Sequence, residues 1–388
     1  MLQALLDRTF RTRSLRLRLP DGRELSAGPG RPELTAVLTE AGAAVAIAAN
    51  PELALGEAYM DGTLRIEGGD IYGFLQLVAS QRALTPPGRL SLVQRLRRGA
   101  EQANDRLRAR SNVQHHYDLT VDFYRLFLDA DLQYSCAFFE TIDSTLEQAQ
   151  LAKKRRLIDK LVLSPGQTAL DIGCGWGGLG LSMARRGARV TGVTLSTEQH
   201  RTANERAAAD GLADQAEFLL QDYRDLDRTF DRIVSVGMFE HVGAPNYQEY
   251  FDTVARLLDD DGVALIHSIG RKTPASRTQP WVRKYIFPGG YIPALSEVMP
   301  AIERAGLWIT DMEILRLHYA ETLRCWRERF LARRADAQAM YDERFCRMWE
   351  FYLAASEVAF RELGHMVFQL QLTKRQTAVP LSRDYLCG

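Results

Sequence analysis

The sequence predicts an α/β fold with a doubly wound parallel sheet, preceded by a small mixed N-terminal domain. From about Gly166, short apolar runs alternate with helical segments, which is the pattern of parallel βαβ units. A glycine-rich stretch follows the first of these runs, as at ligand-binding turns between a strand and a helix. A stretch rich in Pro and Gly at 85–88 separates this part of the chain from the preceding one.

Length and composition limit the classes of protein to be considered. The 388 residues are enough for two or three domains of roughly 150 residues each. With 46% hydrophobic and 25% charged residues, the composition is that of an ordinary soluble protein, which excludes a wholly disordered, collagenous or coiled-coil chain. The 49 basic and 49 acidic residues give zero net charge, so we expect no nucleic-acid partner.

Cysteine spacing and apolar runs indicate the compartment. The five cysteines form no CxxC pair, so we expect no disulfide framework, no metal site and a reducing cytoplasm. The longest small-apolar run, Ala41 to Ala49, falls short of the roughly 20 residues of a membrane span. No apolar segment follows the N-terminus as in a signal peptide. We therefore expect a cytoplasmic protein that meets a membrane only at its surface.

Residues 1–85 are expected to form the small N-terminal domain. Leu15 to Leu19 alternate with basic residues at the period of a strand, and residues 20–23 read Pro-Asp-Gly-Arg, a hairpin turn. Helices are expected at 57–62 and 71–82.

Residues 86–110 are expected to form a basic amphipathic linker helix. Eight arginines lie between Arg82 and Arg110, against Glu101 and Asp105, and apolar residues recur at helical spacing. This pattern is typical of a helix lying on anionic lipid. A charged linker that packs its apolar face on its own protein is the alternative. A second Arg-rich segment, 324–347, is expected to meet the same head groups.

Residues 111–388 are expected to form the α/β domain. Strands are expected at 169–172, 189–193, 216–220, 232–236 and 263–268, and helices at 179–186, 197–209 and 247–258. A hairpin-like turn is expected at 257–262, before the fifth strand, and mostly helical structure from Leu317 to about Leu370.

The turn after the first strand reads DIGCGWGG over residues 171–178. Glycine there lets the backbone turn tightly and approach a ligand. A dinucleotide-binding fold would place a carboxylate about 20 residues further on, but the second strand ends in GVTLS, without one. The acid at the end of strand one, the glycine run and the turn before strand five together resemble the Rossmann-like fold of S-adenosylmethionine-dependent methyltransferases.

Eight blocks, in order along the chain, resemble one enzyme family. They are HHYDLTVDFYRLFLDADLQYSCAFF (115–139), LDIGCGWGGLG (170–180), GVTLSTEQ (192–199), QDYRDL (221–226), GMFEHVG (237–243), IHSIG (266–270), KYIFPGGYIP (284–293) and HYAETLRCW (318–326). Together they resemble the cyclopropane-fatty-acyl-phospholipid synthases and their relatives that modify mycolic acids. The resemblance is strong over 111–388, which it marks as the catalytic domain, and weak over the first 85 residues.

The resemblance implies a reaction at the double bond of an unsaturated phospholipid acyl chain. The alkene takes the methyl group of S-adenosyl-L-methionine, the co-substrate, and loss of a proton from that methyl closes a cyclopropane ring. In this family a bicarbonate ion held in the site takes the proton. Members of this longer type are often homodimers.

The resemblance assigns five residues to bicarbonate: Cys136, Glu240, His267, Ile269 through its backbone, and Tyr319. An anion in a closed site needs hydrogen-bond donors, which a histidine, a tyrosine and a backbone N–H supply. Glu240 must be protonated or accept the proton of bicarbonate itself. Taken singly, such residues are more often structural, for example as a buried small cysteine.

The resemblance also implies the residues that contact S-adenosylmethionine. They are, in chain order, His116 and Tyr117 in a covering segment, Tyr134 and Ser135 at the methionine part, Asp171, Gly173, Gly175 and Trp176 at the glycine turn, Thr194, Ser196 and Gln199 around the ribose, and Asp222 and Tyr223 beside the adenine. For the last pair, a surface turn is the alternative. The chain departs from the family at Thr120 and Val121, where relatives have Gly-Asn, so we expect an ordinary helix or strand in place of a turn with special backbone angles.

Three other functions remain open. The first is a fatty-acyl methyltransferase that gives methylene or methyl-branched chains, the second a small-molecule methyltransferase, and the third a lipid-surface binding protein with a vestigial site. The complete set of anion ligands favours cyclopropane formation, and the extra N-terminal domain favours phospholipid over mycolic acid. We therefore predict a cytoplasmic enzyme, bound peripherally to the inner face of the membrane, that forms cyclopropane rings on unsaturated phospholipids.

Overall fold

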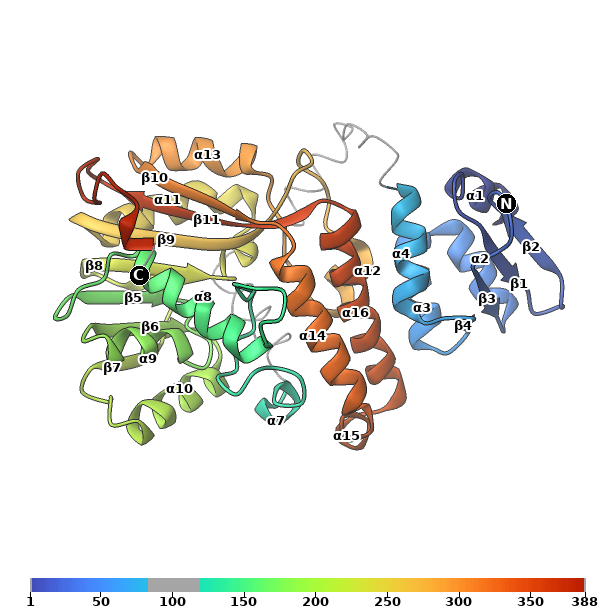
Figure 1. The fold of residues 1–388 in the computed structure, drawn as a ribbon, viewed down its shortest axis with the longest axis horizontal. Coiled ribbons are helices and arrows are strands. Elements are labelled where there is room, and N and C mark those ends of the chain that lie inside the picture. The colour runs from blue at the N-terminus through green and yellow to red at the C-terminus, as the bar shows by residue number, and fades with distance from the viewer. Residues whose placement is uncertain (1, 83–118, 387–388) are drawn as a thin grey trace. The chain divides into compact units, whose positions relative to one another are not determined.

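The computed structural model describes residues 2–82 and 119–386 (Figure 1). The expected linker helix at 86–110, the expected boundary at 85–88 and the expected cofactor residues His116 and Tyr117 lie outside these ranges. The division into three segments therefore stays a prediction.

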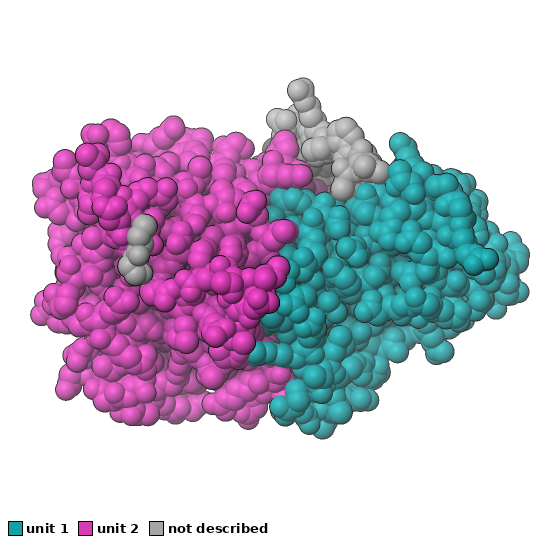
Figure 2. Space-filling view, viewed as in Figure 1, with its two compact units in different colours: residues 1–89, 278–288, 320–365 teal, residues 90–277, 289–319, 366–388 magenta. Residues whose placement is uncertain are grey.

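The chain divides into two compact units that interleave along the sequence (Figure 2). Unit 1 comprises residues 1–89, 278–288 and 320–365, and unit 2 comprises residues 90–277, 289–319 and 366–388. Every described residue of the expected site belongs to unit 2.

Unit 1 contains a four-stranded sheet in the order β2-β1-β3-β4. Its strands are β1 (Leu15–Arg18), β2 (Glu24–Ala27), β3 (Leu34–Leu38) and β4 (Leu64–Glu67). The first two pair antiparallel across the expected turn, where the Gly22 N–H donates to the Leu19 carbonyl (2.9 Å) and Gly22 has a φ of 83°. The strand and hairpin expected here are confirmed.

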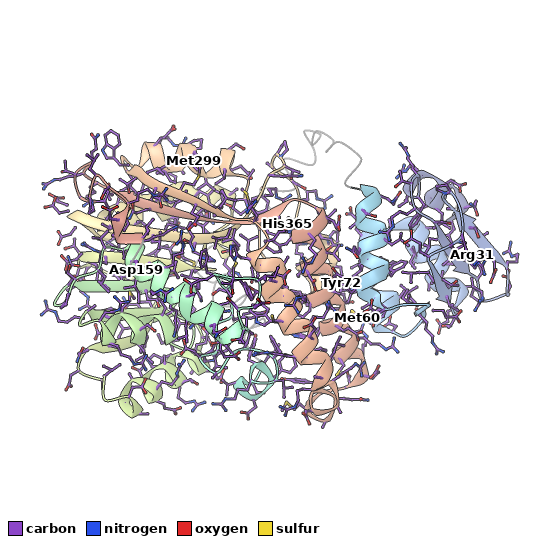
Figure 3. All side chains as sticks on the ribbon, in the orientation of Figure 1. Arg31, Met60, Tyr72, Asp159, Met299 and His365 are labelled. Atoms are coloured by element: carbon purple, nitrogen blue, oxygen red, sulfur yellow. The ribbon has the colours of Figure 1, made fainter. Side chains whose placement is uncertain are left out.

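Helices make up the rest of unit 1. They are α1 (Leu2–Thr9), α2 (Ala41–Ala49), α3 (Pro51–Met60), α4 (Ile71–Arg82), α12 (Pro280–Tyr285), most of α14 (His318–Ala332), α15 (Arg334–Met340) and α16 (Glu343–Glu362). Trp281 is buried so closely against α3 that a Cβ at Gly56 would meet its indole at 2.4 Å. Met60 and Tyr72, labelled in Figure 3, mark α3 and α4, and the Tyr72 ring lies 4.3 Å from the Arg327 guanidinium.

Unit 2 is built on a seven-stranded sheet in the order β10-β11-β9-β8-β5-β6-β7. The strands are β5 (Thr168–Ile172), β6 (Arg189–Thr194), β7 (Ala216–Leu220), β8 (Phe230–Val236), β9 (Leu258–Arg271), β10 (Trp308–Leu315) and β11 (His365–Thr373). Neighbours from β7 to β9 pair parallel, whereas β10 and β11 pair antiparallel.

Helices cover both faces of this sheet and form three layers with it. One apolar core contains α8 (Leu146–Lys160), α9 (Gly178–Arg185), α10 (Thr197–Ala209) and Ala169 of β5. The other contains α11 (Tyr247–Leu257), α13 (Leu295–Arg304) and Leu170 of β5. Adjacent residues of β5 thus face opposite layers, as the pleat of a strand requires. Asp159 and Met299 mark α8 and α13 in Figure 3, and the expected doubly wound α/β fold is confirmed.

The chain order of the parallel strands reverses beside β5. β6 and β7 continue on one side of it, and β8 and β9 on the other. In such sheets, ligands bind in the crevice beyond the carboxyl ends of the strands at this reversal. The segments that follow β5, β6, β7 and β8 carry most of the expected site residues.

For the C-terminal part, one expectation is confirmed and one is wrong. The segment from Leu317 to about Leu370 is mostly helical, with α14, α15 and α16, and β11 begins within its last residues. No separate turn forms at 257–262: Leu257 ends α11, and residues 258–262 belong to β9, where the pairing with β8 shifts in register. Strand β10 has no counterpart among the expected elements.

Candidate active site

The turn between β5 and α9 requires glycine for its conformation. Gly173 and Gly175 have φ values of 80° and 55°, in the left-handed region. A Cβ at Gly173 would meet Met238 at 2.9 Å, so this turn packs directly against the segment after β8. A Cβ at Gly175 would meet nothing within 4 Å. The backbone at Gly175 is therefore open to close approach by a ligand.

Asp171, near the end of β5, is a buried acid with an unsatisfied oxygen. Its Oδ2 accepts no hydrogen bond from a described residue, and only 2% of its surface is exposed. Burial raises the pKa of the carboxyl to about 7, although the charge of Lys153 opposes this. A buried acceptor without a donor is costly. The amino group of S-adenosylmethionine is a donor that could satisfy it.

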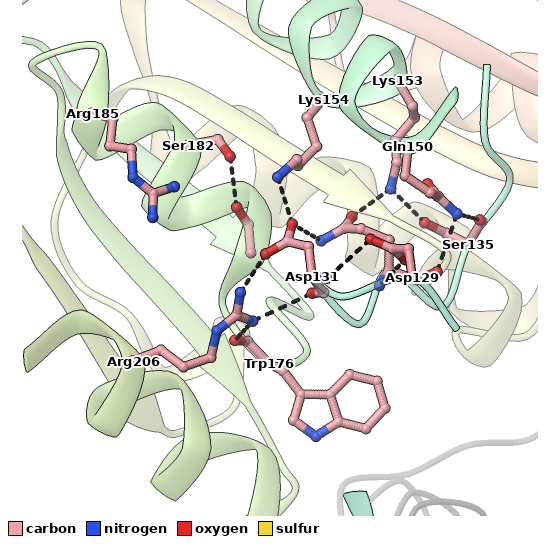
Figure 4. Close-up of polar contacts among 12 residues, drawn as sticks. Asp129, Asp131, Ser135, Gln150, Lys153, Lys154, Trp176, Ser182, Arg185 and Arg206 are labelled. Atoms are coloured by element: carbon pink, nitrogen blue, oxygen red, sulfur yellow. Dashed lines mark hydrogen bonds and ion pairs between the residues drawn. The ribbon is translucent and has the colours of Figure 1, made fainter. Parts of the chain in front are cut away.

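The segment 129–136, which carries three expected site residues, is fixed by buried charges (Figure 4). Asp131 bridges Lys154 of α8 (Nζ–Oδ2 2.5 Å) and Arg206 of α10. Arg206 also donates to the Trp176 carbonyl (2.7 Å). These contacts tie the segment to the glycine turn and to two helices.

Two side chains of α8 hold Ser135. Lys153 Nζ donates to Ser135 Oγ (2.9 Å) and to Gln133 Oε1 (2.5 Å), and Gln150 Nε2 donates to the Ser135 carbonyl (3.0 Å). Burial lowers the pKa of the Lys153 ammonium to about 8. A Cβ at Gly237 would lie 4.0 Å from the Ser135 side chain. Ser135 therefore lies next to the end of β8.

Tyr134 and Trp176 belong to one aromatic cluster. The Tyr124 ring lies edge-on to both, with ring centroids 5.3 Å from Tyr134 and 4.9 Å from Trp176. Tyr124 is the last residue of the short helix α7 (Val121–Tyr124).

Thr120 begins α7 as its N-cap. Its Oγ1 accepts from the Phe123 N–H (3.4 Å), and its backbone is extended, with a φ of −65°. Residues 120–121 therefore form an ordinary capped helix start, as expected from the sequence.

The turn after β6 joins Thr194, Ser196 and Gln199 by hydrogen bonds. Ser196 caps α10 by accepting from the Gln199 N–H (3.3 Å), and its own N–H donates to Thr194 Oγ1 (3.1 Å). Thr194 Oγ1 donates in turn to Gln199 Oε1 (2.9 Å). With Oε1 occupied, Gln199 presents its Nε2 amide as a donor.

Asp222 and Tyr223 follow β7. The Asp222 carboxylate accepts from the Arg224 N–H (3.0 Å) and pairs with the Arg224 guanidinium (2.7 Å). Only 5% of Asp222 is exposed, and the place of this residue beside the adenine stays a prediction. Tyr223 lies edge-on to Tyr250 of α11, with ring centroids 5.7 Å apart.

Glu240 lies in the short helix η2 (Phe239–His241) after β8. Its Oε1 accepts from the Ile269 N–H (2.7 Å), which brings two expected anion ligands into contact and occupies that N–H. Its Oε2 is buried and accepts no hydrogen bond from a described residue. Burial raises the pKa of the carboxyl to about 7, against the opposing effect of the Ile269 N–H. The group can therefore exchange a proton near neutral pH.

His267, in β9, is a buried imidazole held from one side. Its Nδ1 lies 3.0 Å from Gln369 Nε2 of β11. Burial, together with the charges of Lys153 and Lys160, lowers the pKa of the ring to about 3, so the ring is neutral. Its Nε2 has no hydrogen-bond partner in the described part of the chain.

Cys136 and Tyr319 come from segments that lie beside each other. The Phe138 ring stacks on His318 with centroids 4.7 Å apart, and the Phe139 N–H donates to His318 Nδ1 (3.1 Å). Cys136 is fully buried, and Tyr319 is half-buried in the first turn of α14.

The charges around these residues suit an anion. Lys153 interacts electrostatically with Cys136 and lowers the pKa of His267. A buried lysine beside neutral donors creates a positive potential with little water to screen it. Among residues 2–82 and 119–386, no cluster of three or more His, Cys, Asp or Glu side chains could hold a metal ion.

Several buried polar residues near the site escaped the sequence analysis, among them Lys153, Lys160 and Gln369. The two lysines lie in the run LAKKRRLIDK, which has the composition of a solvated helix face. Their spacing of seven places them on one face of α8. This spacing is the signal that could have indicated a shared buried role.

Comparison with known proteins establishes the family. The family model described as mycolic acid cyclopropane synthetase matches residues 104–370. The chain belongs to this family. Residues 1–83 match a domain of unknown function (DUF7884).

Several members of the family are similar over most of the chain. The cyclopropane-fatty-acyl-phospholipid synthase of Escherichia coli K12 is 41% identical over 325 residues, 83% of each chain. Tuberculostearic acid methyltransferase UfaA1 of Mycobacterium tuberculosis is 42% identical over 284 residues, 70% of this chain and 66% of that protein. The structure of mycolic acid cyclopropane synthase CmaA1 complexed with SAH and CTAB has 36% identity and a TM-score of 0.64, covering 68% of this chain and 97% of its own.

Family membership and fold together define the enzyme class. The chain is an enzyme of the S-adenosylmethionine-dependent methyltransferase class, with S-adenosylmethionine as its co-substrate. No helix among the described residues is long and apolar enough to cross a bilayer.

Proposed function

We propose that this family member forms cyclopropane rings on unsaturated acyl chains of phospholipids. The observation that carries the proposal is the similarity to the Escherichia coli phospholipid enzyme, which spans 83% of both chains and so extends over more of this chain than the family model does. The similarity to CmaA1 covers only 68%. The similarity to the phospholipid enzyme therefore extends over more of this chain than the similarity to the mycolic acid enzyme, and we favour a phospholipid substrate.

The residues after β5, β6 and β7 are proposed to hold S-adenosylmethionine. Gly175 offers open backbone, the buried Asp171 oxygen needs a donor, and the Gln199 amide offers one. Ser135 is held by Lys153, so the sulfonium end of the co-substrate would contact a fixed segment of the chain next to Cys136. The methyl group would then face the acyl double bond.

Glu240 and His267 are proposed to hold bicarbonate. The orphaned Glu240 Oε2 can accept its O–H, and His267 Nε2 can donate to one of its other oxygens. When bound there, bicarbonate supplies the base for the proton lost as the ring closes. Because Glu240 already engages the Ile269 N–H, that N–H acts by orienting Glu240 in this state. Cys136 and Tyr319 are proposed as the remaining ligands.

A second candidate is the formation of methyl-branched acyl chains. It is favoured by the 42% identity to tuberculostearic acid methyltransferase UfaA1, as high as that to the cyclopropane synthase. We rank it second because all five expected bicarbonate ligands are present in the sequence.

The location and assembly are also proposals. The phospholipid substrate places the enzyme peripherally at the inner face of the membrane, with residues 86–110 as the expected contact. A homodimer is proposed from the family resemblance alone, and sedimentation analysis of the purified protein tests it.

The substrate class is tested by measuring how fast the enzyme forms S-adenosylhomocysteine in the presence of lipid vesicles. Vesicles of unsaturated phosphatidylglycerol and phosphatidylethanolamine are expected to support turnover, and matched saturated vesicles are not. Removal of dissolved CO2 is expected to slow turnover, and added bicarbonate to restore it. Equal rates on both vesicle types would contradict the lipid assignment, and a rate independent of bicarbonate would contradict the assigned base.

A further inference from the structure

We infer that Gln369 and Lys160 are positioning residues that determine which ring nitrogen of His267 carries the proton. The inference rests on the proposed function, because it gives His267 the task of donating from Nε2 to the anion. Neither residue is assigned to contact the anion or the substrates, since Gln369 meets the imidazole at Nδ1 and Lys160 meets Gln369.

Lys160 fixes the orientation of the Gln369 amide. Lys160 Nζ lies 2.7 Å from one of the two terminal amide atoms of Gln369, and both side chains are buried. An ammonium group can only donate hydrogen bonds, so the atom facing it must be the oxygen, Oε1. The other amide atom, Nε2, then faces His267 Nδ1 at 3.0 Å.

This orientation determines the tautomer of His267. The amide Nε2 group of Gln369 can only donate, so Nδ1 must accept and cannot carry a proton. A neutral imidazole then carries its proton on Nε2. The ring stays neutral because burial and the nearby lysine charges oppose a second proton.

Lys160 is itself held in place. Glu313 of β10 accepts from Lys160 Nζ (2.6 Å) and pairs with Arg156 (2.6 Å). The two cations lower the pKa of the Glu313 carboxyl to about 2. On the neighbouring strand, Gln371 Nε2 donates to the Lys160 carbonyl (2.6 Å). The lysine therefore cannot turn away without leaving charged and polar groups unsatisfied.

The tautomer matters because of what Nε2 faces. No described residue hydrogen-bonds Nε2, so this nitrogen is free to meet a ligand. With a proton it donates to an anion, whereas the other tautomer would present a lone pair and repel it. At metal sites, removing the hydrogen-bond partner that orients a ligating histidine commonly lowers affinity or activity 10- to 100-fold. We expect an effect of similar size here.

The direct test is 15N NMR of the full-length protein labelled at its histidines. His267 is one of seven histidines, and His267→Gln identifies its signals by their loss. The expected spectrum shows a protonated Nε2 and an unprotonated Nδ1 for His267 that do not change between about pH 6 and 8. A proton on Nδ1, or a doubly protonated ring, would overturn the inference.

Gln369→Glu tests the role of the amide. The carboxylate has nearly the same shape but can only accept, so the proton of His267 is expected to move to Nδ1. We expect kcat to fall about 10- to 100-fold, with the KM for S-adenosylmethionine changed less than about twofold. An unchanged tautomer, or a fall in affinity for S-adenosylmethionine as large as the fall in kcat, would count against the inference.

Gln81→Glu is the matched control. It makes the same substitution at another buried glutamine, in unit 1, outside the His267 network. A carboxylate there can still accept from the Arg11 and Thr12 N–H groups, as the amide oxygen does. The tautomer of His267 and the kcat are expected to stay close to wild type, so an equal loss of kcat in both variants would indicate a merely structural effect.

The experiments distinguish a failure of this inference from a failure of the proposed function. The tautomer in the wild-type spectrum is read without any turnover, so it holds or fails whatever the product. If the tautomer is as expected but bicarbonate has no effect on the rate, the positioning stands and the assigned base is wrong.

Discussion

The carboxyl group of Glu240 has a higher pKa in the folded protein than in water. Burial moves its pKa from an ordinary 4.5 to about 7, because the protein interior disfavours the charged form. A carboxyl with a raised pKa stabilises the folded state fully below about pH 4.5, and this stability is lost as the pH rises through 7. The active site is therefore built at a cost in stability at neutral pH.

Glu240→Gln is expected to remove that cost. The amide keeps an oxygen for the Ile269 N–H but does not ionise. In bicarbonate-free buffer, the variant is expected to exceed the wild type in free energy of unfolding by up to about 3 kcal/mol at pH 8. The difference should shrink toward zero below about pH 5. Denaturant unfolding across this pH range checks it, and a difference that does not vary with pH would contradict the raised pKa.

Removing an anion ligand is expected to stop turnover while leaving the co-substrate site intact. Glu240→Ala and Cys136→Ala should each lower kcat about 100- to 10,000-fold, the range typical of proton-transfer groups. The Kd for S-adenosylmethionine, measured by calorimetry, should change little. Glu140→Ala, an exposed carboxylate paired with Arg155, is the control and should behave as wild type. Full activity in both site variants would refute the assignment.

At this scale, sequence reasoning named candidate ligand contacts, of which the fold brings Glu240 and Ile269 together, and missed the buried residues around them. Glu240, His267 and Cys136 stand in short blocks shared with a family. Lys153, Lys160 and Gln369 do not, and their roles depend on partners 18 to 209 residues away along the chain. Charged side chains on a helix are normally expected in solvent, so only the folded structure shows that these two lysines are buried.

At the scale of elements, the short helix α7 is held at both of its ends. Thr120 supplies the side-chain cap, and Tyr124 at the other end packs against Tyr134 and Trp176. The cap thus holds Tyr124 in the aromatic cluster with Tyr134 and Trp176, beside the expected co-substrate site.

Thr120→Ala is expected to destabilise α7 and the aromatic cluster at its end. Loss of an N-cap costs about 1 kcal/mol of stability. Because Tyr124 of α7 packs against Tyr134 and Trp176, two expected co-substrate residues, the KM for S-adenosylmethionine should rise several-fold while kcat changes little. Thr120→Ser keeps the cap and serves as control. A fall in kcat without any change in KM would contradict this placement of α7.

The parallel strands were predictable because their apolar runs alternate with amphipathic helices. β11 does carry a strand signal, the alternation FQLQLT over residues 368–373, which sequence reasoning missed because the segment follows a long helical stretch. β10 was not predictable, because its burial does not alternate: Trp308 and Met312 are half exposed. Their pairing with each other is a long-range contact that no local pattern encodes.

At the scale of the whole molecule, the two Arg-rich segments differ. The arginines of 324–347 pair with carboxylates: Arg324 with Glu321, Arg333 with Asp336, Arg334 with Glu343 and Arg344 with Asp61. Paired charges offer little net attraction to a lipid surface. The excess positive charge of 82–110, known from its sequence, is the better candidate for membrane contact.

Vesicle binding is therefore expected to depend on that segment and on salt. Reversing Arg95, Arg97 and Arg98 to Glu should weaken binding to anionic vesicles at least about tenfold, and raising the salt concentration should weaken the wild type. Reversing Arg185, Arg201 and Arg228, exposed arginines of unit 2, is the control for net charge. Co-sedimentation with vesicles measures both, and equal losses in the two triple variants would contradict a specific contact.

The identity of the product tests the central claim most directly. The purified protein is incubated with unsaturated phospholipid vesicles, bicarbonate and S-adenosylmethionine carrying a fully deuterated methyl group, and the acyl chains are analysed by mass spectrometry and NMR. A cyclopropane synthase is expected to give chains that keep two of the three deuterium atoms, with ring signals and no remaining alkene. Chains that keep all three deuterium atoms, or that keep an alkene, would contradict the account and indicate a methyl- or methylene-forming enzyme.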